Sequence, residues 1–129
     1  MTHRYCVRKK KDKSGEEDKV RYYAVPVLSG KTSAREMAQI ISQRCSLTEG
    51  DVMATIIELA HLIEEEVHNG RKVTLDDIGS FYLSATSEGF ETPEECTPRR
   101  VTANRVCFKA DPKLRKNLKF VKFDKIKEA

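Results

Sequence analysis

Apolar residues recur at helical spacing directly after Ser33. Ser33 and Glu36 form the S-x-x-E pattern of a capping box, in which each side chain satisfies a free backbone N–H of the other residue. The apolar positions that follow are spaced like one face of a helix. They are Ala34, Met37, Ala38, Ile41 and Cys45. The pattern predicts a helix that begins at Ser33 and turns this stripe toward a core.

A second, longer helix is predicted after Thr48, which has Asp51 three residues later as its capping partner. Its apolar stripe consists of Val52, Ile56, Leu59, Ala60, Ile63 and Val67, and it is broadened by Met53, Ile57 and Leu62. A face this wide must be covered from more than one side, so we expect the chain to dimerise through this helix. Asn69-Gly70 predicts its end, since glycine tolerates the left-handed conformation that closes a helix.

Near the N-terminus, the segments Tyr5–Arg8 and Val20–Val27 have the composition of strands. The turn-rich stretch KDKSGEEDK separates them, which predicts a hairpin arm or an edge-strand appendage. Pro26 cannot donate a ladder hydrogen bond, so we expect that part of the second strand to lie at the edge of a sheet.

Strands are also predicted after the helices. Val73 and Leu75 alternate with polar residues, and 78–83 continues as a strand in which Gly79 marks a bend or a close approach of two backbones. The stretch 84–98, SATSEGFETPEECTP, has turn residues at its centre and predicts an exposed hairpin. The segment 101–109 alternates again. One face should carry Thr102, Asn104, Val106 and Phe108, and the other Arg105, Cys107 and Lys109.

The C-terminal part opens with Asp111-Pro112, an N-cap followed by proline at the first helical position. It predicts a short helix on which Leu114 and Leu118 lie four residues apart. Phe120, Val121 and Phe123 indicate a last short strand. Helices and strands in this order predict a mixed α+β fold.

The length and composition of the chain limit how large a core these elements can form. The 129 residues fit one domain with a small appendage. The hydrophobic fraction is only 39% and the charged fraction is 34%, so we expect a partner subunit to complete the core. No apolar run approaches the roughly 18 residues that span a bilayer, and no apolar stretch follows the charges of the start, MTHRYCVRKKKDK. We therefore expect a cytoplasmic protein with no membrane partner.

The four cysteines contain no CxxC pair. They are Cys6, Cys45, Cys96 and Cys107. Without a secretion signal we interpret them as reduced thiols, a disulfide or a zinc site being the alternative.

The net charge of +4 hides a strong segregation along the chain. Residues 1–30 carry +4, residues 31–83 carry −4, residues 84–98 carry −4 and residues 99–129 carry +8. A C-terminal block this basic indicates a polyanionic partner, or a solvated lysine-rich tail that keeps the protein soluble.

The order of these elements, together with VHNGRKVTLDDIGSFYL at 67–83 and VTANRVCFKADPKLRKNL at 101–118, resembles the bacterial HU/integration-host-factor family over residues 32–119. The resemblance implies an intertwined dimer with two N-terminal helices, a β-saddle bearing a long β-hairpin arm, and a short C-terminal helix. It also implies a histone-like, nucleoid-associated protein that binds duplex DNA with little sequence specificity, its arms gripping the minor groove.

By the same resemblance, residues 31–119 form the DNA-binding domain, after an N-terminal β-hairpin extension at 1–30 and before a basic tail or short strand at 120–129. The segment Tyr22–Val27, YYAVPV, is similar to one in a subgroup of HU-related proteins that carry such an extension.

The arm departs from the family pattern. Family arms are rich in Arg and Lys and end in a proline that wedges between base pairs. Here Pro93 supplies a wedge, but Glu91, Glu94 and Glu95 around it would be repelled by phosphates. Phe90 is either a second wedge or a hydrophobic contact of the hairpin. We expect such an arm to bend DNA less than a basic arm would.

The predicted DNA contacts are cations at the arm base, on the closing strand and on the last helix, because neutralising phosphates releases counterions. They are Arg99, Arg100, Arg105, Lys109, Lys113, Arg115 and Lys116, with Pro93 at the tip. Arg99 and Arg100 enter the minor groove or pair with the glutamates of the hairpin. The cluster at 8–11 adds phosphate contacts or is a solvated turn.

Enzymatic motifs are missing from the sequence. It has no Walker loop, no GxSxG elbow and no GxGxxG fingerprint, so we predict no catalytic activity and no cofactor. His61 lies one turn from Glu64 and Glu65 and two turns from His68, a spacing that could hold a metal, but HExxH is absent and we interpret these histidines as solvated. The rival to DNA binding is an HU-like dimer whose acidic arms bind a protein or another copy of the chain.

Overall fold

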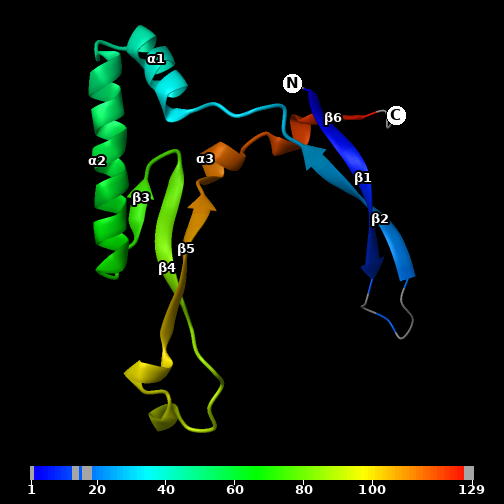
Figure 1. The fold of residues 1–129 in the computed structure, drawn as a ribbon, viewed down its shortest axis with the longest axis vertical. Coiled ribbons are helices and arrows are strands. Elements are labelled where there is room, and N and C mark those ends of the chain that lie inside the picture. Colours follow the sequence, from blue (N-terminus) through cyan, green and yellow to red (C-terminus); the bar gives the residue numbers. More distant parts are fainter. Residues whose placement is uncertain (1, 13–14, 16–18, 127–129) are drawn as a thin grey trace. The chain divides into compact units, whose positions relative to one another are not determined.

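The computed structural model describes residues 2–12, 15 and 19–126, and the chain divides into two compact units. The central unit is residues 34–116, and the terminal unit combines residues 1–33 with residues 117–129. Both appear in Figure 1, where the colours follow the sequence. Helices and two small sheets make this a mixed α+β chain, as the sequence predicts.

The central unit begins with two helices, α1 (Ala34–Arg44) and α2 (Glu49–His68), which pack together. The predicted capping box of α2 is confirmed: the Asp51 N–H donates to Thr48 Oγ1 at 3.1 Å, and the Thr48 N–H donates to Asp51 Oδ2 at 3.3 Å. The predicted stop is also present, because Gly70 has a φ of +83° directly after the C-cap residue. Local capping chemistry therefore determines both ends of α2.

Three antiparallel strands follow α2 in the order β3 (Val73–Leu75), β4 (Gly79–Thr86) and β5 (Thr102–Ala110). Helix α2 contacts β3 and β4, beside which it lies in Figure 1. In the central unit, which the structure describes completely, only three apolar side chains are buried. They are Ala38, Val52 and Val67. This is a small core for a unit of its length.

Gly79 lies where two strands approach most closely. Its φ is +155°, and a Cβ atom at this position would collide with the Lys109 carbonyl oxygen and with the ring of Phe108. The predicted close approach of backbones is thus confirmed. Only glycine fits here, because both the backbone conformation and the available space exclude a side chain.

The predicted alternation of β5 is interrupted. Ser84 pairs with Arg105 but Ala85 pairs with Ala103, so Asn104 has no residue opposite it. This bulge shifts the register by one residue, so Thr102, which pairs with Thr86, lies on the face of Ser84 and Arg105. The expectation that Thr102 shares a face with Val106 and Phe108 is therefore wrong, and Asn104 is the unpaired residue of the bulge. Between the bulge and α3, the alternation of Arg105, Cys107 and Lys109 holds.

Strand pairing of the hairpin ends at Thr86 and Thr102, and the residues between them form a tip loop, 87–101. The loop contains two 3₁₀ turns, η1 (Pro93–Glu95) and η2 (Pro98–Arg100). Each turn has a proline at its first position, where the missing N–H costs no hydrogen bond. The stretch predicted as an exposed hairpin is therefore a paired stalk with a turn-rich tip.

The C-terminal helix is shorter than expected. Helix α3 (Pro112–Arg115) begins as predicted, since the Lys113 N–H donates to the N-cap carboxylate of Asp111 at 2.9 Å. Asn117 then adopts a left-handed conformation with a φ of +70° and is followed by a 3₁₀ turn, η3 (Leu118–Phe120). Leu114 and Leu118 do not share one helix, because the helical path already ends at the C-cap residue Lys116, whose ψ of 139° is extended.

The terminal unit is a three-stranded sheet of order β2-β1-β6. Strands β1 (Thr2–Asp12) and β2 (Lys19–Val27) form the predicted hairpin, and β2 is an edge strand, as Pro26 requires. Strand β6 (Lys122–Lys125) runs parallel to β1 on its other side. The ring of Phe123 lies 5.3 Å from that of His3 and 6.3 Å from that of Tyr5, so aromatic contacts join the two ends of the chain.

Two further observations bear on chemistry. All four cysteines lie among the described residues, and none is in a disulfide. Across 2–12, 15 and 19–126, no helix is both long and apolar enough to cross a membrane.

Candidate nucleic-acid interface

One face of the central sheet carries cations and hydroxyl groups. Arg105 lies opposite Ser84, and Lys109 lies opposite Ser80, so all four side chains belong to the same face. The Ser84 hydroxyl donates to the Arg105 carbonyl oxygen at 3.3 Å. The hydroxyls of Ser80 and Thr74 are 3.1 Å apart. We call this the polar face of the sheet; its donors are of the kind that contact phosphate oxygens.

The opposite face of the same sheet is apolar. Phe81 pairs with Phe108, their ring centroids being 4.9 Å apart, and Leu83 pairs with Val106. A sheet with one polar and one apolar face positions Arg105 and Lys109 rigidly on the polar side.

The tip loop holds one of the predicted arginines in place. The guanidinium of Arg100 lies 5.2 Å from the ring centroid of Phe90, and its Nη1 donates to the Glu95 carbonyl oxygen at 3.3 Å. The Thr92 hydroxyl donates to the Glu95 carboxylate at 3.1 Å. Arg100 therefore contacts the hairpin through a main-chain oxygen and a ring, and Phe90 is half-buried beneath it.

The rest of the tip is exposed and acidic. Arg99 is exposed, as is Pro93 at the start of η1. The four glutamates of the tip are exposed as well. They are Glu88, Glu91, Glu94 and Glu95. A phosphate near Pro93 would be repelled by the carboxylates of its sequence neighbours Glu91, Glu94 and Glu95.

The cations of α3 form a third group. Lys113 Nζ lies 3.2 Å from Asp77 Oδ2 in an exposed ion pair. Asp77 has a φ of +69° in the β3–β4 turn, and the sequence alone did not indicate it as a partner of Lys113. Arg115 and Lys116 are exposed beside it. The predicted contacts thus lie in three groups: the tip, the polar face and α3.

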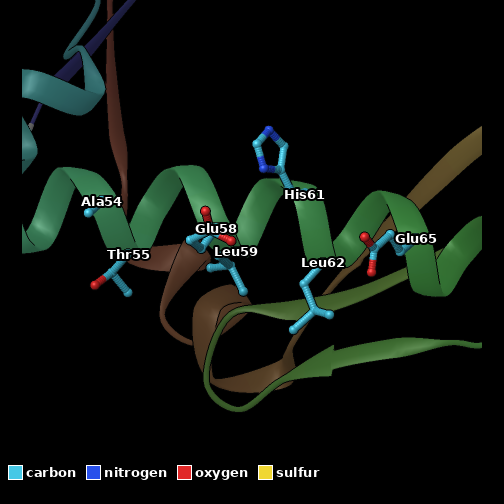
Figure 2. A pocket seen from close by; sticks show the side chains of 7 residues that line it. All are labelled: Ala54, Thr55, Glu58, Leu59, His61, Leu62 and Glu65. Atoms are coloured by element: carbon cyan, nitrogen blue, oxygen red, sulfur yellow. The ribbon is translucent and has the colours of Figure 1, made fainter.

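A shallow groove runs along α2, lined by Ala54, Thr55, Glu58, Leu59, His61, Leu62 and Glu65. Figure 2 shows Leu62 and His61 projecting on opposite sides of the helix. The side chain of Leu62 is 53% exposed, and Ile57 outside the groove is 49% exposed. Within the described ranges, no three His, Cys, Asp or Glu side chains are grouped to hold a metal ion.

Comparison with known proteins gives fold and family. A solved structure of a candidate bacterial DNA-binding protein from Bacteroides vulgatus aligns over 97% of this chain with a TM-score of 0.63 and 10% identity. The alignment covers 48% of the Bacteroides vulgatus protein, so this chain spans about half of its length. The Anabaena HU–DNA cocrystal structure aligns over 67% of this chain and 97% of its own, with a TM-score of 0.51 and 21% identity. No curated protein matches the sequence.

The family model described as "HU domain fused to wHTH, Ig, or Glycine-rich motif" matches residues 1–125, nearly the whole chain. The expected kinship with HU is confirmed, and the match extends over the terminal unit as well as the central one. This chain belongs to the HU-HIG family.

Proposed function

We propose that the chain is a histone-like protein of the bacterial cytoplasm that binds duplex DNA with little sequence preference in an architectural, nucleoid-associated role. The observation that carries the proposal is the polar face, on which Arg105 and Lys109 stand among hydroxyl groups on a rigid sheet. Phosphate contacts of this kind give affinity without reading sequence. The similar Anabaena protein was crystallised with DNA. The proposal requires no cofactor.

The proposed DNA-binding domain is residues 31–119. Its contacts are the polar face together with the tip and α3. They comprise Arg99, Arg100, Arg105, Lys109, Lys113, Arg115, Lys116 and, as a wedge, Pro93.

The proposed active form is a homodimer joined through α2. Large apolar side chains remain exposed on the two long helices of the central unit, α1 and α2, and this unit buries few apolar side chains of its own. They include Met37, Ile40, Ile41, Ile57 and Leu62. Apolar surface of this extent is covered in the folded state of soluble proteins, and the groove on α2 offers a continuous strip for a second copy of the same helix.

The test of the DNA proposal is a salt series. Wild-type protein on random duplex DNA should show log K falling linearly against log salt, with a slope of about −0.9 for each phosphate neutralised. The double variant Arg105→Ala/Lys109→Ala should reduce this slope by about one for each phosphate that is no longer neutralised, and it should weaken binding to all sequences alike. Affinity should fall roughly tenfold per phosphate at about 0.1 M salt.

The control for this test is Arg35→Ala/Arg44→Ala, which removes the same charge from exposed positions on α1. It should leave the slope close to the wild-type value. If the two double variants behave alike, the polar face is not the binding surface.

A second expected result concerns DNA bending, measured as energy transfer between the labelled ends of a duplex. Wedging a proline costs a few kcal/mol of unstacking, which phosphate contacts must offset. The glutamates beside Pro93 remove those contacts, so we expect a small bend that Pro93→Ala leaves unchanged. Glu94→Lys/Glu95→Lys should enlarge it. A large bend that collapses in Pro93→Ala would show that the wedge works despite its surroundings.

The acidic tip favours one alternative: an HU-fold dimer whose arms bind a protein. Four exposed glutamates on a loop without exposed cations before Arg99 suit a basic partner rather than DNA. The salt series separates the two functions, because a protein-binding module would show no salt-dependent affinity for duplex DNA.

A further inference from the structure

The two units of this protein carry opposite net charge. The central unit has 11 Lys and Arg against 14 Asp and Glu, a net charge of −3. The terminal unit has 13 against 6, a net charge of +7. The basic C-terminal block of the sequence is thus divided, because residues 117–129 belong to the terminal unit. Net charge governs attraction to a polyanion, so the terminal unit should attract DNA more strongly than the central one.

Much of this charge lies on what we call the distal ribbon, residues 6–12 of β1 and 19–25 of β2. Strand β6 pairs with β1 only from Thr2 to Tyr5. Beyond Tyr5 the sheet narrows to two strands, a feature visible in Figure 1. The pairing of these strands is continuous from Cys6 opposite Val25 to the last pair, Asp12 opposite Lys19. Among the residues that the structure describes, the ribbon therefore has two regularly paired strands and no third strand along it.

Six exposed cations project from the distal ribbon: Arg8, Lys10, Lys19 and Arg21 on one face, and Lys9 and Lys11 on the other. Lys10 lies directly opposite Arg21, so two cations are adjacent across the ribbon. Arg8 and Arg21 also interact within the chain. The net charge of +7 already includes the acidic residues between the two strands in the sequence. The ribbon thus concentrates positive charge on both of its faces, which favours a polyanionic partner.

The aromatic residues of the ribbon suit the same partner. Tyr22 is 69% exposed opposite Lys9, and Tyr23 is 44% exposed opposite Arg8. Tyrosine hydroxyls donate hydrogen bonds to phosphate oxygens. The major groove of B-DNA, about 12 Å wide, admits a two-stranded β-ribbon. A ribbon with cations on both faces can reach the phosphates on both walls of that groove.

We propose that the distal ribbon is a second duplex-DNA contact, which enters the major groove and binds phosphates on both sides without reading the sequence. This inference deepens the proposed DNA-binding function and rests on it for the identity of the polyanion. The ribbon and the polar face are separate surfaces on separate units, so each can be removed without the other.

The test uses full-length protein and the triple variant Lys10→Ala/Lys11→Ala/Lys19→Ala. In the salt series, the slope should fall by about three for each ribbon bound, and affinity at about 0.1 M salt should fall by roughly 10²- to 10³-fold. The matched control, Arg35→Ala/Arg44→Ala/Lys72→Ala, removes the same charge from exposed positions of the central unit. Equal slopes for the two triple variants would overturn the proposal.

Two further measurements make the outcome specific. Bulky substituents at cytosine C5 obstruct the major groove. A duplex that carries them should bind wild-type protein more weakly than the unsubstituted duplex does, but it should bind the triple variant equally well. Equal binding of wild-type protein to the two duplexes would overturn the placement in the groove.

If Arg105→Ala/Lys109→Ala has no effect while the ribbon variant weakens binding, the polar face is not a DNA-binding surface and the proposal for the ribbon is supported. The reverse pattern overturns the ribbon alone. Circular dichroism melts should be unchanged in every variant, since all the altered side chains are exposed.

Discussion

Leu62→Glu should convert the protein from a dimer to a monomer. Leu62 is 53% exposed in the groove on α2, so a single chain loses little when it is replaced. In a two-fold symmetric dimer, by contrast, each partner would bury the new carboxylate against apolar surface, at a cost on the order of 3 kcal/mol. Two copies then raise the dissociation constant by roughly 10⁴-fold. Glu58 and Glu65, which line the same groove, add repulsion.

Sedimentation or light scattering at micromolar concentration measures this change. The control is Glu64→Lys, an exposed position on α2 outside the groove, where a larger change of charge should leave the dimer intact. If wild-type protein already has the monomer mass, or if Leu62→Glu keeps the wild-type mass, dimerisation through this groove is excluded. A folded monomer for Leu62→Glu would also show that the central unit is stable with its small core alone.

Gly79→Ala should destabilise the fold more than the same substitution at Gly30, Gly50, Gly70 or Gly89. Two independent costs add at this position. A non-glycine residue at a φ of +155° is strained by about 1–3 kcal/mol. The new Cβ would also collide with the Lys109 carbonyl oxygen and the ring of Phe108, and such overpacking costs about 1–3 kcal/mol. We expect the free energy of unfolding, measured by denaturant titration at fixed protein concentration, to fall by about 4 kcal/mol, the sum of the two mid-range costs.

Gly70→Ala is the matched control for this prediction. Gly70 also has a positive φ, +83°, but no atom lies within 4 Å of a Cβ built there. It should lose only about 1 kcal/mol, the ordinary cost of a left-handed alanine. Similar losses for the two variants would mean that Phe108 and the β5 backbone move aside at little cost, and the close approach of the strands would then not be a constraint on the fold.

The helices and most strands followed from the sequence because their determinants are local. The capping box of Thr48 and Asp51, and the glycine after Asn69, define α2 from residues within one turn of its ends. Strand-like composition on both sides of a turn-rich stretch likewise located β1 and β2, although β1 extends beyond the predicted Tyr5–Arg8 to Thr2–Asp12. The acidic character of the tip loop is a matter of composition, which needs no coordinates.

The features that the sequence did not reveal depend on contacts between distant segments or on a single backbone residue. The bulge at Asn104 shifts one strand against another, and nothing in the alternation of β5 alone marks the position. The last helix ends after Arg115, where Lys116 is extended and Asn117 is left-handed, although the sequence pattern predicts a helix that continues to Leu118. The stacking of Arg100 on Phe90 requires the tip loop to fold back on itself.

The sequence by itself determined the number of cations, the acidity of the arm and the two helices, because these follow from residue identity and from spacing along a few turns. Only the tertiary structure decided which sheet each charge belongs to. Strand β6 pairs with β1 although the two lie at opposite ends of the chain, and this pairing assigns the C-terminal lysines to the terminal unit and leaves the central unit acidic. Charge counted over consecutive residues cannot reveal this division, because contacts between segments distant in the sequence determine which strands pair.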